Sequence, residues 1–237
     1  MRIAFKTDKG KKHKDNDDAI LVDQERGLFL LADGMGGCQG KVASRMAVEE
    51  AYACLKDRIH SAKEGSAVSN LLGEAIAHAH VAITGKSKIA SKLKGMGSTL
   101  MIMAIRGNTA HICHVGDSRA YIIRGALSQL TTDHTLENSL YGNSSLSELF
   151  LLQKPRVLSQ AVGATKKIDH ETIEIAVQPD DVLLLCTDGL TDMLTDEEIA
   201  ELIRGYEDKL QDAADILIAG ANIRGGKDDI SVVLVAI

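Results

Sequence analysis

Four aspartates stand at the ends of apolar stretches that are typical of buried strands. Asp33 and Asp188 each follow such a stretch and precede glycine, Asp117 follows glycine after a third stretch, and Asp228 precedes a fourth. A carboxylate at a buried strand end costs folding free energy unless it is paired or binds a cation. Oxygen ligands on rigid strand ends suit Mg²⁺ or Mn²⁺, the ions of much phosphoryl chemistry. The four residues therefore predict a metal-dependent enzyme that acts on phosphate.

The stretch 33–40 adds a second signal, because glycines occupy positions 34, 36, 37 and 40. Glycines let backbone amides and carbonyls approach an ion or a phosphate closely. The structural alternative is a tight turn before a helix. Each of the four aspartates likewise has an alternative role as a turn, helix-capping or strand-end residue. One shared site accounts for all four with a single explanation.

A basic loop at 9–14 runs directly into an acidic cluster that contains Asp17 and Asp18. The cluster resembles a calcium loop only loosely, because the glycine and the terminal glutamate of an EF-hand are missing. One interpretation is a solvated surface loop. The other is that Lys12, His13 and Lys14 hold a phosphate beside the metals.

Cys113 and Arg119 have the Cys-x5-Arg spacing of the thiolate phosphatases. That chemistry needs a loop of backbone amides that leads into a helix N-terminus. Here the loop contains Asp117, whose charge repels a phosphate, and a strand-like stretch follows. The spacing is therefore interpreted as a coincidence.

Apolar periodicity predicts an irregular order of strands and helix pairs. Strands are expected at 2–7, 19–23, 28–32, 98–105, 109–115, 119–124, 126–130, 171–177, 181–187 and 229–237, and helices at 40–60, 67–83, 157–162, 196–204 and 208–220. The run 98–130 resembles an antiparallel meander. Because strands and helices do not alternate regularly, we expect an α+β sandwich of four layers, α/β/β/α, built from two mainly antiparallel sheets flanked by helix pairs. The 237 residues are expected to form a single domain.

Composition and charge limit the partners. A net charge of −6 argues against nucleic-acid binding. The N-terminus lacks the apolar core of a signal peptide and no run is long enough to span a membrane, so we expect a cytoplasmic protein. A monomer is the default expectation, because no sequence pattern indicates the oligomeric state. The four cysteines lie far apart, which favours neither a zinc site nor a disulfide frame. Cys38, within the glycine loop, is the cysteine closest to the expected chemistry, and a redox role for it stays open.

Taken together and in chain order, these motifs resemble the PP2C (PPM) family of metal-dependent serine/threonine protein phosphatases, in its compact bacterial form. The matching stretches are 15–19, 30–37, 95–100, 115–121, 130–135, 184–192 and 225–233. Any one of them is a weak signal, whereas seven in the family's order are specific.

The resemblance implies a centre of two Mn²⁺ or Mg²⁺ ions between the sheets, with a possible third. Asp33 would bridge two ions, the Gly34 carbonyl would serve one, and Asp188 and Asp228 the other. Asp117 would help hold the third ion. Asp17 and Asp18 would act through metal-bound water, the nucleophile would be a water held by Asp33, and residues 136–156 would form a flap. The implied reaction is hydrolysis of phosphoserine or phosphothreonine on proteins, reversing a partner serine/threonine kinase.

Some positions depart from the family pattern. His13 stands where an arginine usually grips the phosphate, Asp17 replaces glutamate or glutamine, and Asp229 replaces asparagine. Met35 stands where eukaryotic members have histidine, so no general acid is identified. The departure at His13 supports an alternative function: a catalytically weak relative that binds phosphoproteins or a kinase as a regulator.

Overall fold

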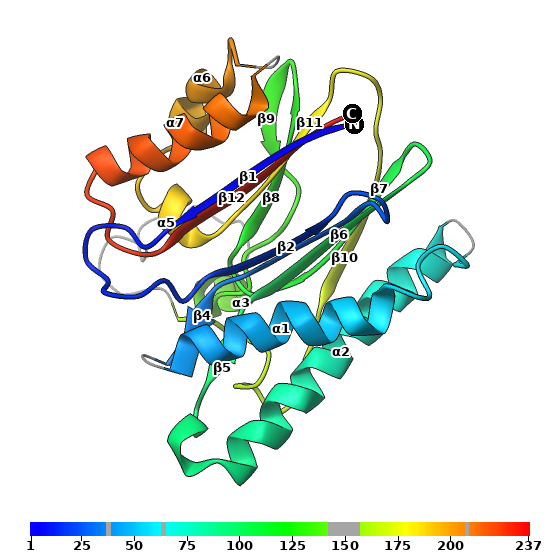
Figure 1. The fold of residues 1–237 in the computed structure, drawn as a ribbon, viewed down its shortest axis with the longest axis vertical. Coiled ribbons are helices and arrows are strands. Elements are labelled where there is room, and N and C mark those ends of the chain that lie inside the picture. Colours follow the sequence, from blue (N-terminus) through cyan, green and yellow to red (C-terminus); the bar gives the residue numbers. More distant parts are fainter. Residues whose placement is uncertain (37–38, 63–64, 142–156, 207–208) are drawn as a thin grey trace.

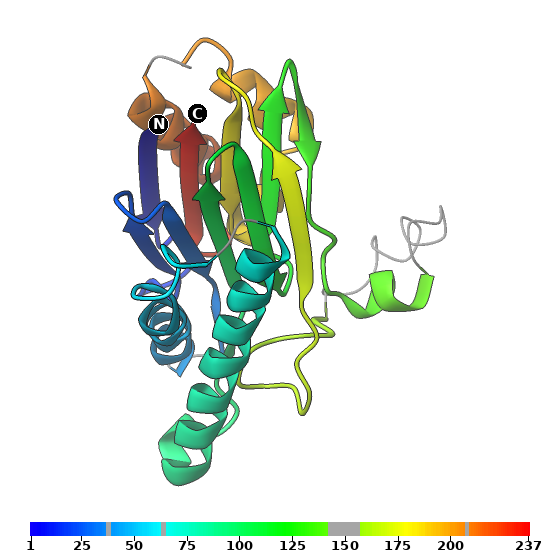
Figure 2. The ribbon, with the colours of Figure 1, turned by 90° about the vertical axis from the view of Figure 1, so that its right-hand side faces the viewer.

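The computed structural model describes residues 1–36, 39–62, 65–141, 157–206 and 209–237. Two five-stranded antiparallel sheets pack face to face, and helix pairs cover their outer faces (Figures 1 and 2). The helices α1 and α2 lie against one sheet and α6 and α7 against the other. The expected α+β sandwich of four layers is confirmed.

The first sheet brings the two ends of the chain side by side, as Figure 1 shows. Its strands, in spatial order, are β1 (Arg2–Asp8), β12 (Ile230–Ala236), β11 (Val182–Cys186), β8 (Arg119–Arg124) and β9 (Ala126–Gln129). Because β12 pairs with both β1 and β11, the segment just before β12 lies beside the segment just after β11.

The second sheet carries the other long strands. In spatial order these are β10 (Glu171–Ala176), β7 (Thr109–Val115), β6 (Leu100–Arg106), β3 (Leu28–Ala32) and β2 (Ala19–Asp23). A two-residue ladder of β4 (Gly34–Met35) with β5 (Gly97–Ser98) extends from the ends of β3 and β6.

The helices follow the sheets. They are α1 (Gly40–Leu55), α2 (Ser66–Ile89), the short 3-10 helix η2 (Ser91–Leu93), α3 (Leu136–Tyr141), α5 (Asp188–Thr191), α6 (Asp196–Ile203) and α7 (Leu210–Ile223). Thr195 and Glu198 form a complete capping box at the start of α6, which fixes that boundary. Among the described residues, none of the helices combines the length and the apolarity needed to cross a membrane.

Three aliphatic cores hold the layers together, and β3 contributes to two of them. Leu28 and Leu30 face α1 and α2, whereas Phe29 and Leu31 face the opposite sheet. Because side chains alternate across a strand, an almost continuously apolar strand must be covered on both faces. The strand predicted at 28–32 is confirmed, and it lies inside the sheet, between β6 and β2.

The expected meander over 98–130 is wrong. β6 and β7 pair in one sheet, whereas β8 and β9 pair in the other. The crossover takes place at Gly116, whose φ of 110° belongs to the region that favours glycine. A Gly-Asp-Ser turn is compatible with a hairpin and with a crossover between sheets. The turn alone therefore does not predict whether β7 and β8 pair with each other.

Three helix predictions also need correction. α1 ends at Leu55, not near residue 60. A turn follows it, in which the Ile59 amide donates to the Leu55 carbonyl and the Ile59 side chain is buried, so the apolar pattern continues past the end of the helix. α2 continues to Ile89. The predicted helix stopped at residue 83 because the last turns of α2 project beyond the sheet and carry no buried face that an apolar pattern could show. No helix forms at 157–162, where isolated bridges join Leu158 to Thr135 and Val162 to Ser98.

Candidate metal centre

The strand-end aspartates converge at one end of the sandwich, where a cavity of about 890 Å³ opens between the sheets. Its lining residues are Lys12, His13, Lys14, Asp15, Asp17, Asp33, Gly34, Met35, Thr99, Asp117, Val157, Leu158, Asp188 and Asp228. With the exception of Asp18, every residue that the sequence placed in the site, including the basic ones, lines this cavity. Asp18 lies beside it, since among the neighbouring charges the Asp18 carboxylate has the largest effect on the pKa of Asp33.

Asp33 is held through its backbone, which leaves its carboxylate for the cavity. The Asp33 amide donates to Thr99 Oγ1 at 2.9 Å, and the Thr99 amide donates back to the Asp33 carbonyl at 2.9 Å. The Ser98 hydroxyl also donates to that carbonyl, at 2.7 Å. Ser98 and Thr99 belong to the stretch 95–100 that resembles the family, but the sequence indicates no role for them; their hydroxyl groups at the start of an apolar strand were the available signal.

Asp188 begins the short helix α5 at the end of β11, an element that periodicity did not predict. The following residue, Gly189, packs so closely against the Asp229 carbonyl oxygen that a Cβ would collide with it. This close approach brings the start of α5 against the residues that precede β12. It explains how Asp188 and Asp228, which are 40 residues apart in sequence, come to share one cavity wall.

Gly34 supplies a second close approach. A Cβ at Gly34 would collide with the backbone of Gly40 and with the Asp17 carbonyl oxygen. The glycines at 34 and 40 therefore let the acidic loop pack onto the turn that follows Asp33. Gly37 and Cys38 lie outside the described residues, so the expectation for Cys38 stays a prediction.

The acidic loop is tied to the segment before β12. The Asp17 amide donates to Asp229 Oδ2 at 2.7 Å, and Asp18 Oδ2 accepts from the Thr187 hydroxyl at 2.9 Å. Asp229 is almost fully buried, and its carboxyl group holds this loop by accepting from the Asp17 amide and by lying 3.3 Å from His13 Nδ1. The sequence alone shows Asp229 as a departure from the family pattern, whereas these contacts show that its carboxyl group tethers the acidic loop.

The carboxyl groups resist ionisation in the absence of a cation. Loss of solvent raises the pKa of Asp33 and of Asp188 well above the usual range, and the neighbouring aspartates raise both further. Burial is also the main cause that raises the pKa of Asp18 to about 7 and the pKa of Asp17 above its ordinary value. Like charges crowded in a poorly solvated site disfavour the charged form in this way.

These residues fit hard divalent cations. Asp18 Oδ1 and Asp188 Oδ1 are buried and have no hydrogen-bond partner among the described residues. A buried polar oxygen without a partner costs about 1–3 kcal/mol, so a ligand for these atoms removes a penalty. The donors are carboxylate and carbonyl oxygens, which favour Mg²⁺ or Mn²⁺ over softer ions.

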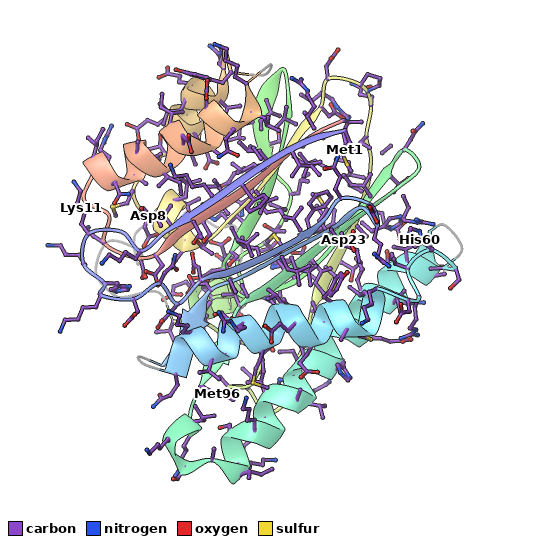
Figure 3. All side chains as sticks on the ribbon, in the orientation of Figure 1. Met1, Asp8, Lys11, Asp23, His60 and Met96 are labelled. Atoms are coloured by element: carbon purple, nitrogen blue, oxygen red, sulfur yellow. The ribbon has the colours of Figure 1, made fainter. Side chains whose placement is uncertain are left out.

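The basic residues occupy the rim of the cavity. His13 Nδ1 lies 3.3 Å from Asp228 Oδ1 and 3.3 Å from Asp229 Oδ1, so the ring is directed at the acidic pair. Lys12 and Lys14 flank it on the same loop, are exposed and line the cavity. Figure 3 shows the start of this loop at the margin of the molecule, with Asp8 and Lys11 labelled.

The geometry excludes Cys113 as a phosphatase nucleophile. Its side chain is fully buried on β7, and burial raises the pKa of the thiol to about 12. A reactive cysteine needs the opposite shift and access to solvent. Arg119 is bound to Asp133 through several hydrogen bonds of 2.7–3.1 Å and is not available for a phosphate.

Fold and cavity thus define a class of protein: a two-sheet sandwich with a site for hard divalent ions at the end of its central strands. The model of the Protein phosphatase 2C family matches residues 8–219. The chain belongs to the protein phosphatase 2C family, which confirms the expected family and the enzyme class, serine/threonine protein phosphatase.

Individual relatives support this assignment along the whole chain. A serine/threonine phosphatase of Listeria monocytogenes is 34% identical over 244 residues, which cover 99% of this chain and 95% of that protein. The structure of the S. agalactiae serine/threonine phosphatase is similar with a TM-score of 0.90 and 32% identity, covering 100% of this chain and 99% of that one. The catalytic domain of the phosphatase PstP, in complex with two manganese ions, has a TM-score of 0.84 and 31% identity, over 98% of this chain and 96% of that one.

Proposed function

We propose that this protein hydrolyses phosphoserine and phosphothreonine on proteins, with two divalent metal ions held in the carboxylate-lined cavity. The observation that carries the proposal is the convergence of Asp33, Asp117, Asp188 and Asp228 from separate strand ends into that cavity. Partnerless buried oxygens on Asp18 and Asp188 add to it. The family supplies the reaction class, and a relative of 31% identity contains two manganese ions.

The proposed roles follow the position of each residue in the cavity. Asp33 would contact both ions, with the Gly34 carbonyl serving one and the carboxylates of Asp188 and Asp228 the other. Asp117, next to Asp188, would help to hold a third ion. Asp17 and Asp18 would orient water around the centre.

Bound Mg²⁺ or Mn²⁺ supplies Lewis acidity, which lowers the pKa of a water and neutralises charge on the phosphate oxygens. The protein's own part is to hold and orient the reactants. The Asp33 carboxylate would fix the attacking water in line with the phosphorus, and the basic rim would hold the phosphate. No covalent phosphoenzyme is required, which agrees with the burial of Cys113.

The substrates are expected to be phosphorylated proteins, including a serine/threonine kinase that this enzyme would reverse. We propose that residues 1–237 act as one catalytic domain and as a monomer in the cytoplasm. The proposed flap includes α3, whereas residues 142–156 lie outside the described residues.

The test of the function is the release of inorganic phosphate from p-nitrophenyl phosphate and from a phosphothreonine peptide. Turnover is expected with Mn²⁺ or Mg²⁺ and should disappear when a chelator removes the metal. The orientation of His13 toward Asp228 and Asp229 favours one alternative, a regulator that binds phosphoproteins without efficient hydrolysis. Folded protein that binds the phosphopeptide but shows no turnover in saturating Mn²⁺ would establish that alternative.

Lys14→Ala is expected to raise the KM for the phosphopeptide roughly three- to tenfold with little change in kcat, because an exposed lysine attracts the phosphate without contacting the reacting atoms. Steady-state kinetics at fixed Mn²⁺ measures both constants. Lys11→Ala is the matched control, since Lys11 lies on the same loop and does not line the cavity. Equal KM values for the two variants would remove Lys14 from the phosphate site.

A further inference from the structure

The turn that carries Asp117 is the crossover between the two sheets, and its backbone is tightly constrained. Gly116 adopts a φ of 110° and packs against Thr99 so closely that a Cβ would lie 2.5 Å from Thr99 Cγ2. Ser118 Oγ hydrogen-bonds Thr99 Oγ1 at 2.8 Å, and that same oxygen accepts from the Asp33 amide. The turn is therefore coupled to the strand end that supplies Asp33.

Two adjacent residues, Asp133 and His134, hold both sides of this turn. Asp133 binds the guanidinium of Arg119, which follows Asp117 in the sequence. His134 binds Gly116, which directly precedes Asp117: the His134 amide donates to the Gly116 carbonyl at 3.0 Å, and the Gly116 amide donates to His134 Nδ1 at 3.3 Å. Gly116 is thus held by a reciprocal pair of hydrogen bonds from one residue.

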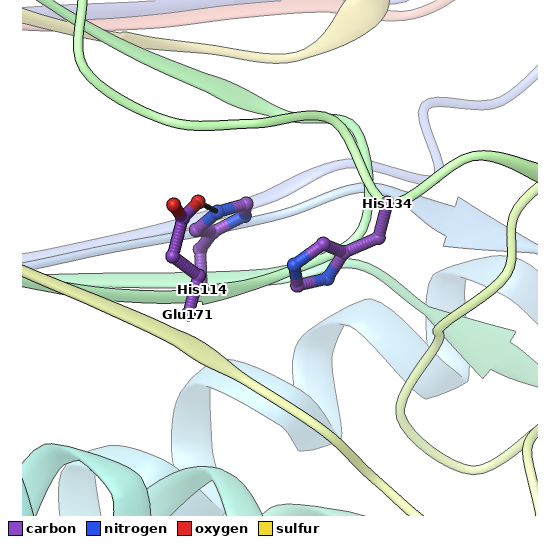
Figure 4. Close-up of side chains that lie close together, drawn as sticks. All are labelled: His114, His134 and Glu171. Atoms are coloured by element: carbon purple, nitrogen blue, oxygen red, sulfur yellow. Dashed lines mark hydrogen bonds and ion pairs between the residues drawn. The ribbon is translucent and has the colours of Figure 1, made fainter. Parts of the chain in front are cut away.

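The ring of His134 is itself supported by a second histidine and a glutamate, as Figure 4 shows. The rings of His114 and His134 stack with centroids 4.6 Å apart and an interplanar angle of 19°. His114 Nε2 lies 2.8 Å from Glu171 Oε2, and the Thr132 amide donates to the same oxygen at 2.9 Å. Glu171 therefore links the His114 ring to the segment that carries His134.

These contacts require a defined protonation state. To accept from the Gly116 amide, His134 Nδ1 must carry no proton, so the neutral ring holds its proton on Nε2. Burial and the neighbouring His114 lower the pKa of His134 to about 4, which keeps the ring neutral at pH 7. The donor atoms of the three residues lie within 4.8 Å of one another, but stacked rings do not direct their nitrogen lone pairs at a common point as a tetrahedral site demands.

We propose that His134, supported by His114 and Glu171, is a positioning residue that fixes the Gly116 peptide and thereby aims the Asp117 carboxylate at the metal cavity. The inference rests on the proposed function for the role of Asp117. It adds a residue that contacts neither the metal nor the substrate. Residues that orient a metal ligand through hydrogen bonds typically affect metal affinity by one to two orders of magnitude.

The test compares His134→Asn with His134→Gln. The Asn Oδ1 stands at the position of the histidine Nδ1 and can still accept from the Gly116 amide, whereas the longer Gln places its amide near the former Nε2. Hydrogen exchange of metal-free protein reads the Gly116 amide directly. We expect His134→Gln to accelerate that exchange roughly fivefold, the value of about one lost hydrogen bond, and His134→Asn to preserve protection.

A second readout is Mn²⁺ binding by calorimetry. The weakest bound Mn²⁺ is expected to lose roughly tenfold in affinity in His134→Gln and to recover in His134→Asn, with the tighter ions unchanged. Nitrogen NMR of metal-free wild type should show His134 as the Nε2–H tautomer. His78→Asn, on the exposed face of α2, is the matched control and should match wild type in all three measurements.

The outcomes separate this inference from the proposed function. Absence of metal-dependent phosphate release from wild type would refute the function, whereas hydrogen exchange and NMR use metal-free protein. Equal exchange in the Asn and Gln variants, or an Nδ1–H tautomer, would overturn the positioning role even in an active phosphatase. Altered exchange without any change in Mn²⁺ affinity would overturn the link to Asp117.

Discussion

Asp188→Asn is expected to reduce Mn²⁺-dependent phosphate release at least about a hundredfold while the protein remains folded. A neutral amide at this position gives up the charge that balances a divalent ion, and loss of one electrostatic contact in a catalytic site costs two to three orders of magnitude. The measurement is kcat/KM with p-nitrophenyl phosphate in saturating Mn²⁺. Asp212→Asn, on an exposed turn of α7, is the matched control and should retain full activity.

The same substitution should not destabilise the metal-free protein. In wild type, Asp188 Oδ1 is buried without a partner among the described residues, and burial raises the pKa of this carboxyl. Asn removes a crowded acid without removing packing volume, so the urea midpoint in chelator should equal or exceed that of wild type. Full activity in Asp188→Asn would remove this residue from the metal centre. A lowered urea midpoint would show that Asp188 is primarily a structural residue.

The second large effect is a pH-dependent stabilisation by metal. Mn²⁺ at about 100 times its Kd contributes about 2.7 kcal/mol to the free energy of unfolding. For a chain of this size that corresponds to an increase in Tm of about 5–10 °C. We expect the increase at pH 8 to exceed the increase at pH 6, because Mn²⁺ must displace protons from carboxyl groups whose pKa values are raised.

The sign follows from the pKa shifts. Asp18 has a pKa of about 7 in the folded state and 3.8 as its ordinary value, so folded metal-free protein binds more protons than unfolded protein between these limits. Its contribution to stability is complete below about pH 4 and is lost as the pH rises through about 7. The raised pKa values of Asp33 and Asp188 act in the same direction. Histidines with a lowered pKa, such as His134, act in the opposite direction below about pH 6.5.

Calorimetry measures the difference in Tm between protein with Mn²⁺ and protein with chelator at each pH. This difference reports the stabilisation by the metal, because the effect of the histidines on Tm is the same in both samples at one pH. Asp188→Asn should show a smaller difference at both pH values. An increase in Tm that is identical at pH 6 and pH 8 would contradict the prediction, since it would mean that these carboxyls are already ionised in the metal-free protein.

The sequence by itself determined the fold class and predicted the strand-end carboxylates that meet in one cavity. Apolar runs such as 28–32 and 182–186 predict buried strands from local pattern alone. Asp33 and Asp188 stand at the ends of these runs, where burying a carboxylate costs folding free energy, and their positions therefore indicate a function. Because both signals are local, they do not depend on knowing which strands become neighbours.

The tertiary structure alone decided which elements meet. The crossover at Gly116, the approach of Gly189 to the Asp229 carbonyl, and the orientation of His13 toward Asp228 and Asp229 depend on contacts between distant segments. The support of Gly116 by His134 depends on such contacts as well. Turn chemistry and periodicity fix the conformation of neighbouring residues, whereas these contacts follow from how two sheets pack, which no local pattern encodes.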